Sequence, residues 1–274
     1  MSGRPALHLP SIDDIRAARD RIAGLAIRTP LIRLADPGPH GPGARPEVFL
    51  KLENLQPIGS FKIRGAGNAM RRLGADALRQ GVCTASAGNM GQGVAWCARD
   101  MGVACRVIVP DSAPEAKLGA LAALGAEVVR VPFADWWRVM ETHQTPGVPG
   151  AFIHPVEHTD VMAGNGTIAL EILEDLPDAD TVLVPFGGGG LICGIGAGLR
   201  ALSPGCRVLA AEVETAAPLR ASLDAGQPRT ITRVPSFVDG IGGASVLPAM
   251  WPLVRQVVAD AVVVTLDEIA DAVR

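Results

Sequence analysis

The stretch Val182-Leu183-Val184-Pro185-Phe186-Gly187-Gly188-Gly189-Gly190-Leu191-Ile192-Cys193-Gly194 joins a short apolar run to a helical pattern through four glycines. An apolar, β-branched run followed by a helical pattern recurs along most of the chain. Strands separated by helix-length segments indicate βαβ units and parallel sheets with helices on both faces. The sequence therefore predicts an α/β protein, with strands at residues 48–52, 81–85, 104–109, 127–131, 181–185, 207–212 and 261–265 and helices at residues 11–23, 62–74, 90–101, 113–124, 161–175, 191–202 and 217–225.

The composition excludes several classes of protein. A chain of 274 residues with 48% hydrophobic content and a mean hydropathy of +0.27 predicts a sizeable core in one large or two modest domains. A net charge of −3 and a pI near 6.0 give no reason to expect nucleic acid or a membrane as partner. The start lacks the apolar segment of a signal peptide, and no apolar run reaches the length of a membrane span, so we predict a soluble, cytoplasmic protein. Five cysteines without a Cys-x-x-Cys pair favour reduced thiols.

Lys62 stands out because the chain has only three lysines against 22 arginines. An ε-amine can lose its proton when it is desolvated and then attack a carbonyl, whereas a guanidinium stays protonated and cannot form an imine. Lys62 is therefore a candidate Schiff-base lysine. The alternative is that an arginine-rich composition spared this lysine by chance.

The four glycines at 187–190 predict a site for a phosphate group. Glycines between a strand and a helix let several backbone N–H groups converge at the positive end of the helix. The run lacks the Lys-Ser/Thr of a nucleotide P-loop, and no acidic residue follows at the spacing of a dinucleotide fingerprint. A monophosphate therefore fits better than ATP or NAD, with a tight structural turn as the alternative.

A second turn, Thr84-Ala85-Ser86-Ala87-Gly88-Asn89-Met90-Gly91-Gln92, also lies between an expected strand and an expected helix. Its backbone amides and the Ser86 hydroxyl could hold a carboxylate, and the Asn89 amide could hydrogen-bond a ring hydroxyl. Taken alone, the turn fits an ordinary N-capped helix. Together with a reactive lysine and a phosphate cradle, it describes pyridoxal phosphate with an amino acid bound to it.

These motifs resemble those of a known enzyme family. The run from Leu50 to Ala66, Leu-Lys-Leu-Glu-Asn-Leu-Gln-Pro-Ile-Gly-Ser-Phe-Lys-Ile-Arg-Gly-Ala, is similar to the cofactor-lysine segment of the serine/threonine dehydratase family. That family includes threonine ammonia-lyase and serine racemase, within the tryptophan-synthase-β-like group of pyridoxal phosphate enzymes. Further segments match it in the same order, namely residues 9–15, 86–89, 163–167, 187–190 and 238–241.

The resemblance implies the fold and the site. The fold would be PLP fold type II, with two three-layer α/β/α domains and the cofactor in the cleft between them. Residues 1–68 and 152–274 would form the large cofactor-binding domain, and residues 69–151 the small substrate-side domain. Lys62 would be the catalytic residue, and the partners would be a small amino acid substrate and a second copy in a homodimer. The implied cofactor-binding residues are Phe61, Lys62, Asn89, Gly187, Gly188, Gly189, Gly190 and Leu191, and the implied substrate-binding residues are Ser86, Ala87, Gly88, Asn89 and Met90.

The implied activity is that of a dehydratase, or ammonia-lyase, which converts L-threonine or L-serine to a 2-keto acid and ammonia by α-proton abstraction and β-elimination. Racemases of this family place a second serine where Ala87 stands. The β-replacement enzymes usually carry Thr and Asp where this chain has Met90 and Ile63. Both activities stay open as alternatives on the same scaffold.

No metal site is expected. Some family members bind a divalent cation through a Glu, a carbonyl and an Asp. Glu212 and Ala216 match the first two positions, but Pro218 occupies the third, and a hard cation needs several oxygen ligands.

The C-terminal end differs from the family pattern. Relatives continue for some tens of residues beyond Arg274, and that portion contacts the ring nitrogen of the cofactor. In this chain Thr265 to Glu268 predict a capping box that starts a helix shortly before the last residue. We expect a truncated chain, a split gene or a naturally short enzyme, and an inactive homologue that still binds pyridoxal phosphate is a further alternative.

The remaining candidates receive structural roles. His143, His154 and His158 lack the spacing of metal ligands. Asp160 is expected to cap the helix that follows it, although Asp160 and Glu157 could also reach the cleft. Trp136 and Trp137 are expected to pack at a domain edge.

Overall fold

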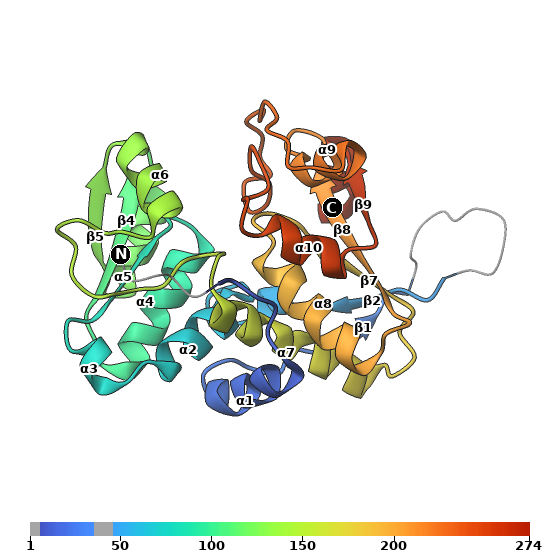
Figure 1. The fold of residues 1–274 in the computed structure, drawn as a ribbon, viewed down its shortest axis with the longest axis horizontal. Coiled ribbons are helices and arrows are strands. Elements are labelled where there is room, and N and C mark those ends of the chain that lie inside the picture. The colour runs from blue at the N-terminus through green and yellow to red at the C-terminus, as the bar shows by residue number, and fades with distance from the viewer. Residues whose placement is uncertain (1–5, 36–45) are drawn as a thin grey trace.

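The computed structural model describes residues 6–35 and 46–274. These residues form two separate parallel sheets with helices packed against them (Figure 1). The first sheet has the strand order β5-β4-β3-β6. Side chains alternate across β4, so that Val107 packs with α2 and α4 whereas Ile108 packs with α6. Helices therefore cover both faces of this sheet. Its elements are α3 (Ala75–Leu78), β3 (Val82–Ala85), α4 (Asn89–Met101), β4 (Cys105–Pro110), α5 (Glu115–Ala123), β5 (Glu127–Val131), α6 (Phe133–Thr142) and β6 (Ala151–Phe152).

The second sheet has three parallel strands in the order β7-β8-β9. Val184 and Ala210 are buried on the face that packs against α8 and α10. On the other face, Leu183 is 55% exposed and Val262 is 38% exposed. The elements of this half are β7 (Thr181–Pro185), α8 (Gly190–Leu202), β8 (Arg207–Val213), α9 (Pro218–Ala225), α10 (Trp251–Val257), β9 (Asp260–Val264) and α11 (Leu266–Val273).

Three helices lie between the two sheets, namely α1 (Ile12–Ile22), α2 (Lys62–Arg72) and α7 (Thr159–Asp175) (Figure 1). Glycines let α7 pack closely against its neighbours. A Cβ at Gly164 of α7 would lie 2.3 Å from the Arg64 carbonyl oxygen of α2, and a Cβ at Gly194 of α8 would lie 2.2 Å from the Met162 carbonyl oxygen of α7. The N-terminal part also contains an antiparallel pair, β1 (Leu31–Arg33) and β2 (Phe49–Lys51), and the 3₁₀ turn η1 (Glu53–Leu55).

The predicted α/β class with mainly parallel sheets is confirmed, and so are the predicted strands and helices apart from shifts at their ends. The capping boxes at Ser11 and Thr265 form as expected. Sequence patterns missed β1, β6, α3 and α10, which have three, two, four and seven residues and are too short for a clear periodicity. The domain boundaries stay a prediction; the one after residue 68 lies inside the continuous helix α2.

None of the helices in the described part of the chain has both the length and the apolar character of a membrane span. Four of the five cysteines, Cys83, Cys97, Cys105 and Cys193, are buried, and Cys206 is half-buried. All five are free, as reduced thiols would be.

A buried ion cluster holds α2 to its neighbours. Arg64 is 1% exposed and donates to both carboxylate oxygens of Glu53, at 2.8 Å each, and to Glu171 on α7 at 2.6 Å. Lys51 of β2 donates to the other oxygen of Glu171. Burial alone would lower the pKa of Arg64, but the hydrogen bonds to Glu53 and Glu171 outweigh it and raise that pKa. Arg64 therefore keeps its charge, and its bonds tie η1, α2 and α7 together, with β2 joined through Lys51.

We expect Glu171→Gln to lower the free energy of unfolding by about 3 kcal/mol, because removing one partner of a buried ion pair leaves the others uncompensated. Urea denaturation followed by circular dichroism measures the change. Asp76→Asn is the matched control, since Asp76 pairs with Arg79 on the surface, where an ion pair contributes at most about 1 kcal/mol. Equal effects of the two substitutions would contradict the assignment.

Candidate active site

Lys62 is the first residue of α2 and points its amine toward the chain at Pro155. The turn before it closes through a hydrogen bond from Gly59 N to Gln56 O and uses a left-handed φ of +70° at Gly59. The amine lies 3.4 Å from the Pro155 carbonyl oxygen and 5.2 Å from the centre of the Phe61 ring. Burial lowers the pKa of Lys62 from its ordinary value of 10.5 to about 8. A substantial fraction of the amine is therefore neutral near physiological pH.

The four glycines at 187–190, here called the glycine loop, connect β7 to α8. Gly189 has a left-handed φ of +95°, which favours glycine. A Cβ at Gly188 would lie 2.4 Å from the Val156 side chain, so this position has no room for one. The loop ends at the N-terminus of α8, where backbone N–H groups lack partners within the helix and attract an anion.

The turn formed by Pro155, Val156 and Glu157, here called the 155–157 turn, lies between the amine and the glycine loop. Pro155 accepts from Lys62, and Val156 packs against Gly188. Two sites that the sequence predicts separately, 125 positions apart, are therefore both in contact with two consecutive residues. They face one site.

The turn at residues 86–88 leads into α4, and α4 packs against the start of α2. A Cβ at Gly93, in the second turn of α4, would lie 3.2 Å from the Lys62 carbonyl oxygen. Ser86 accepts a hydrogen bond from Gly88 N at 3.3 Å. Asn89 is exposed, whereas the Met90 side chain is 2% exposed and packs in the core below the turn. The backbone of this turn, rather than Met90, thus presents polar groups to the site.

The residues present fit a phosphate-bearing aldehyde. An amine with a lowered pKa can bond to an aldehyde, and the glycine loop can bind a phosphate. Two buried oxygens near these groups have no hydrogen-bond partner in the described part of the chain, namely Ser60 Oγ, two residues before Lys62, and Asn165 Oδ1. Asn165 Nδ2 donates to the Gly190 carbonyl oxygen at 3.3 Å, whereas Asn165 Oδ1 faces Gly65 of α2. Buried polar atoms without partners indicate room for a polar ligand.

Other residues singled out from the sequence have structural partners. The Glu212 carboxylate accepts from Leu219 N at 2.9 Å and from Arg220 N at 2.7 Å, and so caps α9. The expectation that Asp160 caps α7 is wrong: the cap is His158, whose Nδ1 accepts from Asp160 N. The Asp160 carboxylate pairs with Arg72. Both side chains can cap a helix, and only the backbone geometry decides between them.

One cluster escaped the sequence analysis. His143, His154 and Glu157, here called the histidine cluster, bring their ligand-type atoms within 4.8 Å of one another. Their spacing of 11 and 3 residues across a proline- and glycine-rich linker matches no common ligand pattern. A chain reversal at His143, which has the left-handed φ of +58°, brings them together.

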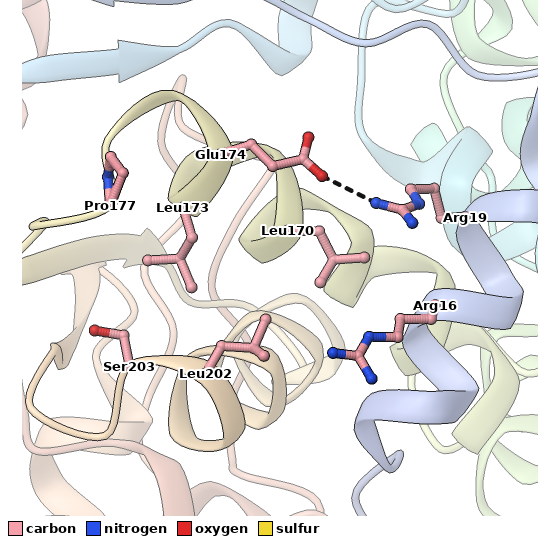
Figure 2. A pocket seen from close by; sticks show the side chains of 8 residues that line it. All are labelled: Arg16, Arg19, Leu170, Leu173, Glu174, Pro177, Leu202 and Ser203. Atoms are coloured by element: carbon pink, nitrogen blue, oxygen red, sulfur yellow. Dashed lines mark hydrogen bonds and ion pairs between the residues drawn. The ribbon is translucent and has the colours of Figure 1, made fainter.

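A cavity of about 380 Å³ lies away from these residues, against α1, α7 and the end of α8 (Figure 2). Arg19 and Glu174 form an ion pair across it. Its lining shares no residue with the predicted site and consists of Arg16, Arg19, Leu170, Leu173, Glu174, Pro177, Leu202 and Ser203.

Comparison with known proteins gives a consistent result. The family model described as pyridoxal-phosphate dependent enzyme matches residues 22–274. An L-threonine ammonia-lyase of Thermotoga maritima is 38% identical over 230 residues, which span 83% of this chain and 57% of that protein. The catabolic L-threonine dehydratase of Escherichia coli K12 is 38% identical over 96% of this chain and 79% of its own length. The structure of maize serine racemase superposes with a TM-score of 0.81 at 32% identity, covering 97% of this chain and 81% of that one.

We expect the Lys62 amine to react with pyridoxal phosphate at unusually low pH. Because its pKa is lowered to about 8, borohydride trapping should reach half of its maximum near pH 8 and rise further as the amine loses its proton. Mass spectrometry of the trapped peptide measures this. In Lys62→Ala, this trapped peptide should be absent at every pH, because the amine that forms the link is gone. A midpoint near 10 for Lys62 would refute the lowered pKa.

Gly188→Ala should weaken binding of pyridoxal phosphate about tenfold, because overpacking costs about 1–3 kcal/mol. The added methyl group would collide with Val156. Fluorescence titration of the cofactor-free protein gives the affinity. The double variant Gly188→Ala/Val156→Ala removes the collision and should recover most of the lost affinity; no recovery would mean that the glycine loop and the 155–157 turn are not in contact.

Proposed function

The chain belongs to the family of pyridoxal-phosphate dependent enzymes, and we propose that it is a dehydratase that converts a small β-hydroxy amino acid, L-threonine or L-serine, to a 2-keto acid and ammonia. The observation that carries the proposal is the Lys62 amine, with its lowered pKa, facing the glycine loop across the 155–157 turn. Relatives named threonine ammonia-lyase and threonine dehydratase support the same reaction.

The cofactor would be held by residues at both ends of the site. Lys62 would bind its aldehyde, and the glycine loop would bind its phosphate through backbone N–H groups at the start of α8. The Phe61 ring, 5.2 Å from the Lys62 amine, and Asn89 would border the bound cofactor. When bound, pyridoxal phosphate withdraws electrons from the α-carbon of the substrate, which makes the α-proton acidic.

The protein's own contribution to the reaction is proton transfer and orientation. The Lys62 Nζ, whose pKa is lowered to about 8, would accept the α-proton of the substrate in its neutral form. The turn at residues 86–88 would bind the substrate carboxylate with backbone N–H groups at the start of α4. These contacts fix the α-carbon relative to Nζ, which favours the transfer over other reactions.

The surroundings of the amine favour a substrate with a neutral side chain. The lowered pKa of Lys62 comes from burial, and no charged side chain among the described residues contributes to it. A hydroxyl-bearing side chain such as that of threonine or serine adds no charge there. A carboxylate, as in 3-hydroxyaspartate, would enter a site whose low polarity penalises it.

Racemisation is the second candidate, since serine racemases are similar over nearly the whole chain. Inversion at the α-carbon needs a proton donor on the face opposite to Lys62. Ala87, on the turn beside Lys62, carries a methyl group and has no proton to give. This favours elimination over inversion.

An assay with L-threonine and L-serine tests the proposal. We expect keto acid and ammonia in equal amounts from the wild-type protein loaded with pyridoxal phosphate. Lys62→Ala should lower this activity by at least a thousandfold, since it removes the proton acceptor and the covalent link. Lys117→Ala is the matched lysine control and should change it by less than about threefold, because Lys117 forms an exposed ion pair with Asp239.

The other outcomes distinguish the alternatives. Inversion of serine without keto acid would support the racemase. A visible band of bound cofactor without turnover of either amino acid would support a binding protein that lacks catalytic activity.

A further inference from the structure

The histidine cluster is packed tightly beside the proposed site. The rings of His143 and His154 stack with their centres 4.1 Å apart and an angle of 10° between planes. Phe152 meets both rings edge-on, with centres 5.9 Å away in each case. His143 Nε2 lies 3.0 Å from a carboxylate oxygen of Glu157. His154 itself is 1% exposed.

This geometry does not suit a metal ion. A histidine nitrogen binds a metal along its lone pair, which lies in the plane of the ring. The rings of His143 and His154 are almost parallel, so their lone pairs lie in two separate planes. They cannot both point at one metal ion. The cluster must therefore have a role other than metal binding.

The hydrogen bonds of His154 fix its tautomer. Nδ1 accepts from Val156 N at 3.0 Å and from Glu157 N at 2.6 Å, so it carries no proton. Nε2 lies 3.1 Å from the Met140 carbonyl oxygen in α6 and donates to it. One neutral ring thus links the end of α6 to the backbone of the 155–157 turn.

That turn is the segment that contacts both halves of the proposed site. Its first residue, Pro155, accepts from the Lys62 amine, and its second, Val156, fills the space beside Gly188. The two N–H groups that His154 accepts belong to the second and third residues of the turn. Both N–H groups are half-buried. If they lost their acceptor, the turn would move to satisfy them elsewhere, because an N–H shielded from water without a partner is unfavourable.

We propose that His154 is a positioning residue for the proposed reaction: its ring fixes the 155–157 turn, and the turn fixes the Lys62 amine relative to the glycine loop. The stack with His143 holds the ring in place and joins it to the C-terminal end of α6. This inference rests on the proposed function, but its consequences for the amine and for cofactor binding are independent of turnover.

Substitutions at residue 154 separate the functions of the ring. His154→Asn keeps an acceptor, because its oxygen stands as many bonds from Cα as Nδ1 does. His154→Phe keeps a ring for the stack and removes the acceptor. His154→Gln keeps a donor toward Met140 and removes the acceptor at the Nδ1 position, and it serves if the Phe variant does not fold. His158→Asn is the matched control, since His158 caps α7 and does not contact the 155–157 turn through the hydrogen bonds of its ring.

Two measurements on the folded proteins test the proposal. We expect His154→Phe, or His154→Gln, to bind pyridoxal phosphate about tenfold more weakly. The pH midpoint for borohydride trapping of Lys62 should rise by about one unit, because water reaches the amine when the turn moves. His154→Asn should restore both values to near those of the wild type, and His158→Asn should leave them unchanged.

A purely structural role predicts a different result. Variants with a lower melting temperature but with wild-type cofactor affinity and trapping midpoint would overturn the proposal. A wild-type protein that traps the cofactor but does not turn over threonine or serine would refute the proposed function alone. The changes in cofactor affinity and in the trapping midpoint would still decide the positioning role of His154. A wild-type protein in which Lys62 traps no cofactor would overturn both.

Discussion

A guanidinium that is almost fully buried has to be matched by carboxylates, and this requirement organises the centre of the molecule. Arg64 meets it with Glu53 and Glu171, which come from η1 and α7. Since Lys51 also pairs with Glu171, the cluster fixes β2 as well. The cluster therefore fixes the start of α2 relative to α7. Lys62, two residues before Arg64, is fixed with it.

That residue, Lys62, experiences the opposite electrostatic situation. Arg64 is almost fully buried and Lys62 is partly buried on the same helix. Arg64 has two carboxylate partners and keeps its charge, whereas burial lowers the pKa of Lys62 to about 8 and no carboxylate offsets it. About half a helix turn thus separates a charge that holds the fold together from an amine with a lowered pKa.

The site is completed by segments that are distant in sequence and belong to both sheets. The 155–157 turn follows β6 of the first sheet and contacts the glycine loop of the second. An exposed ion pair between Lys117 on α5 and Asp239 joins the same two halves, and the chain just beyond Asp239 passes the glycine loop, where Gly242 N donates to Phe186 O at 3.3 Å. The glycine loop is therefore bordered by chain from both halves.

The sequence by itself determined the alternation of strands and helices, and it singled out the candidate lysine and the glycine loop, because periodicity, a lysine among arginines and a glycine run are local signals. Only the tertiary structure decided which residues lie between Lys62 and the glycine loop. The histidine cluster depends on a chain reversal at His143, and the choice of His158 over Asp160 as helix cap depends on backbone angles. Contacts of this kind arise when distant segments pack together, so they cannot be predicted from a short stretch of sequence.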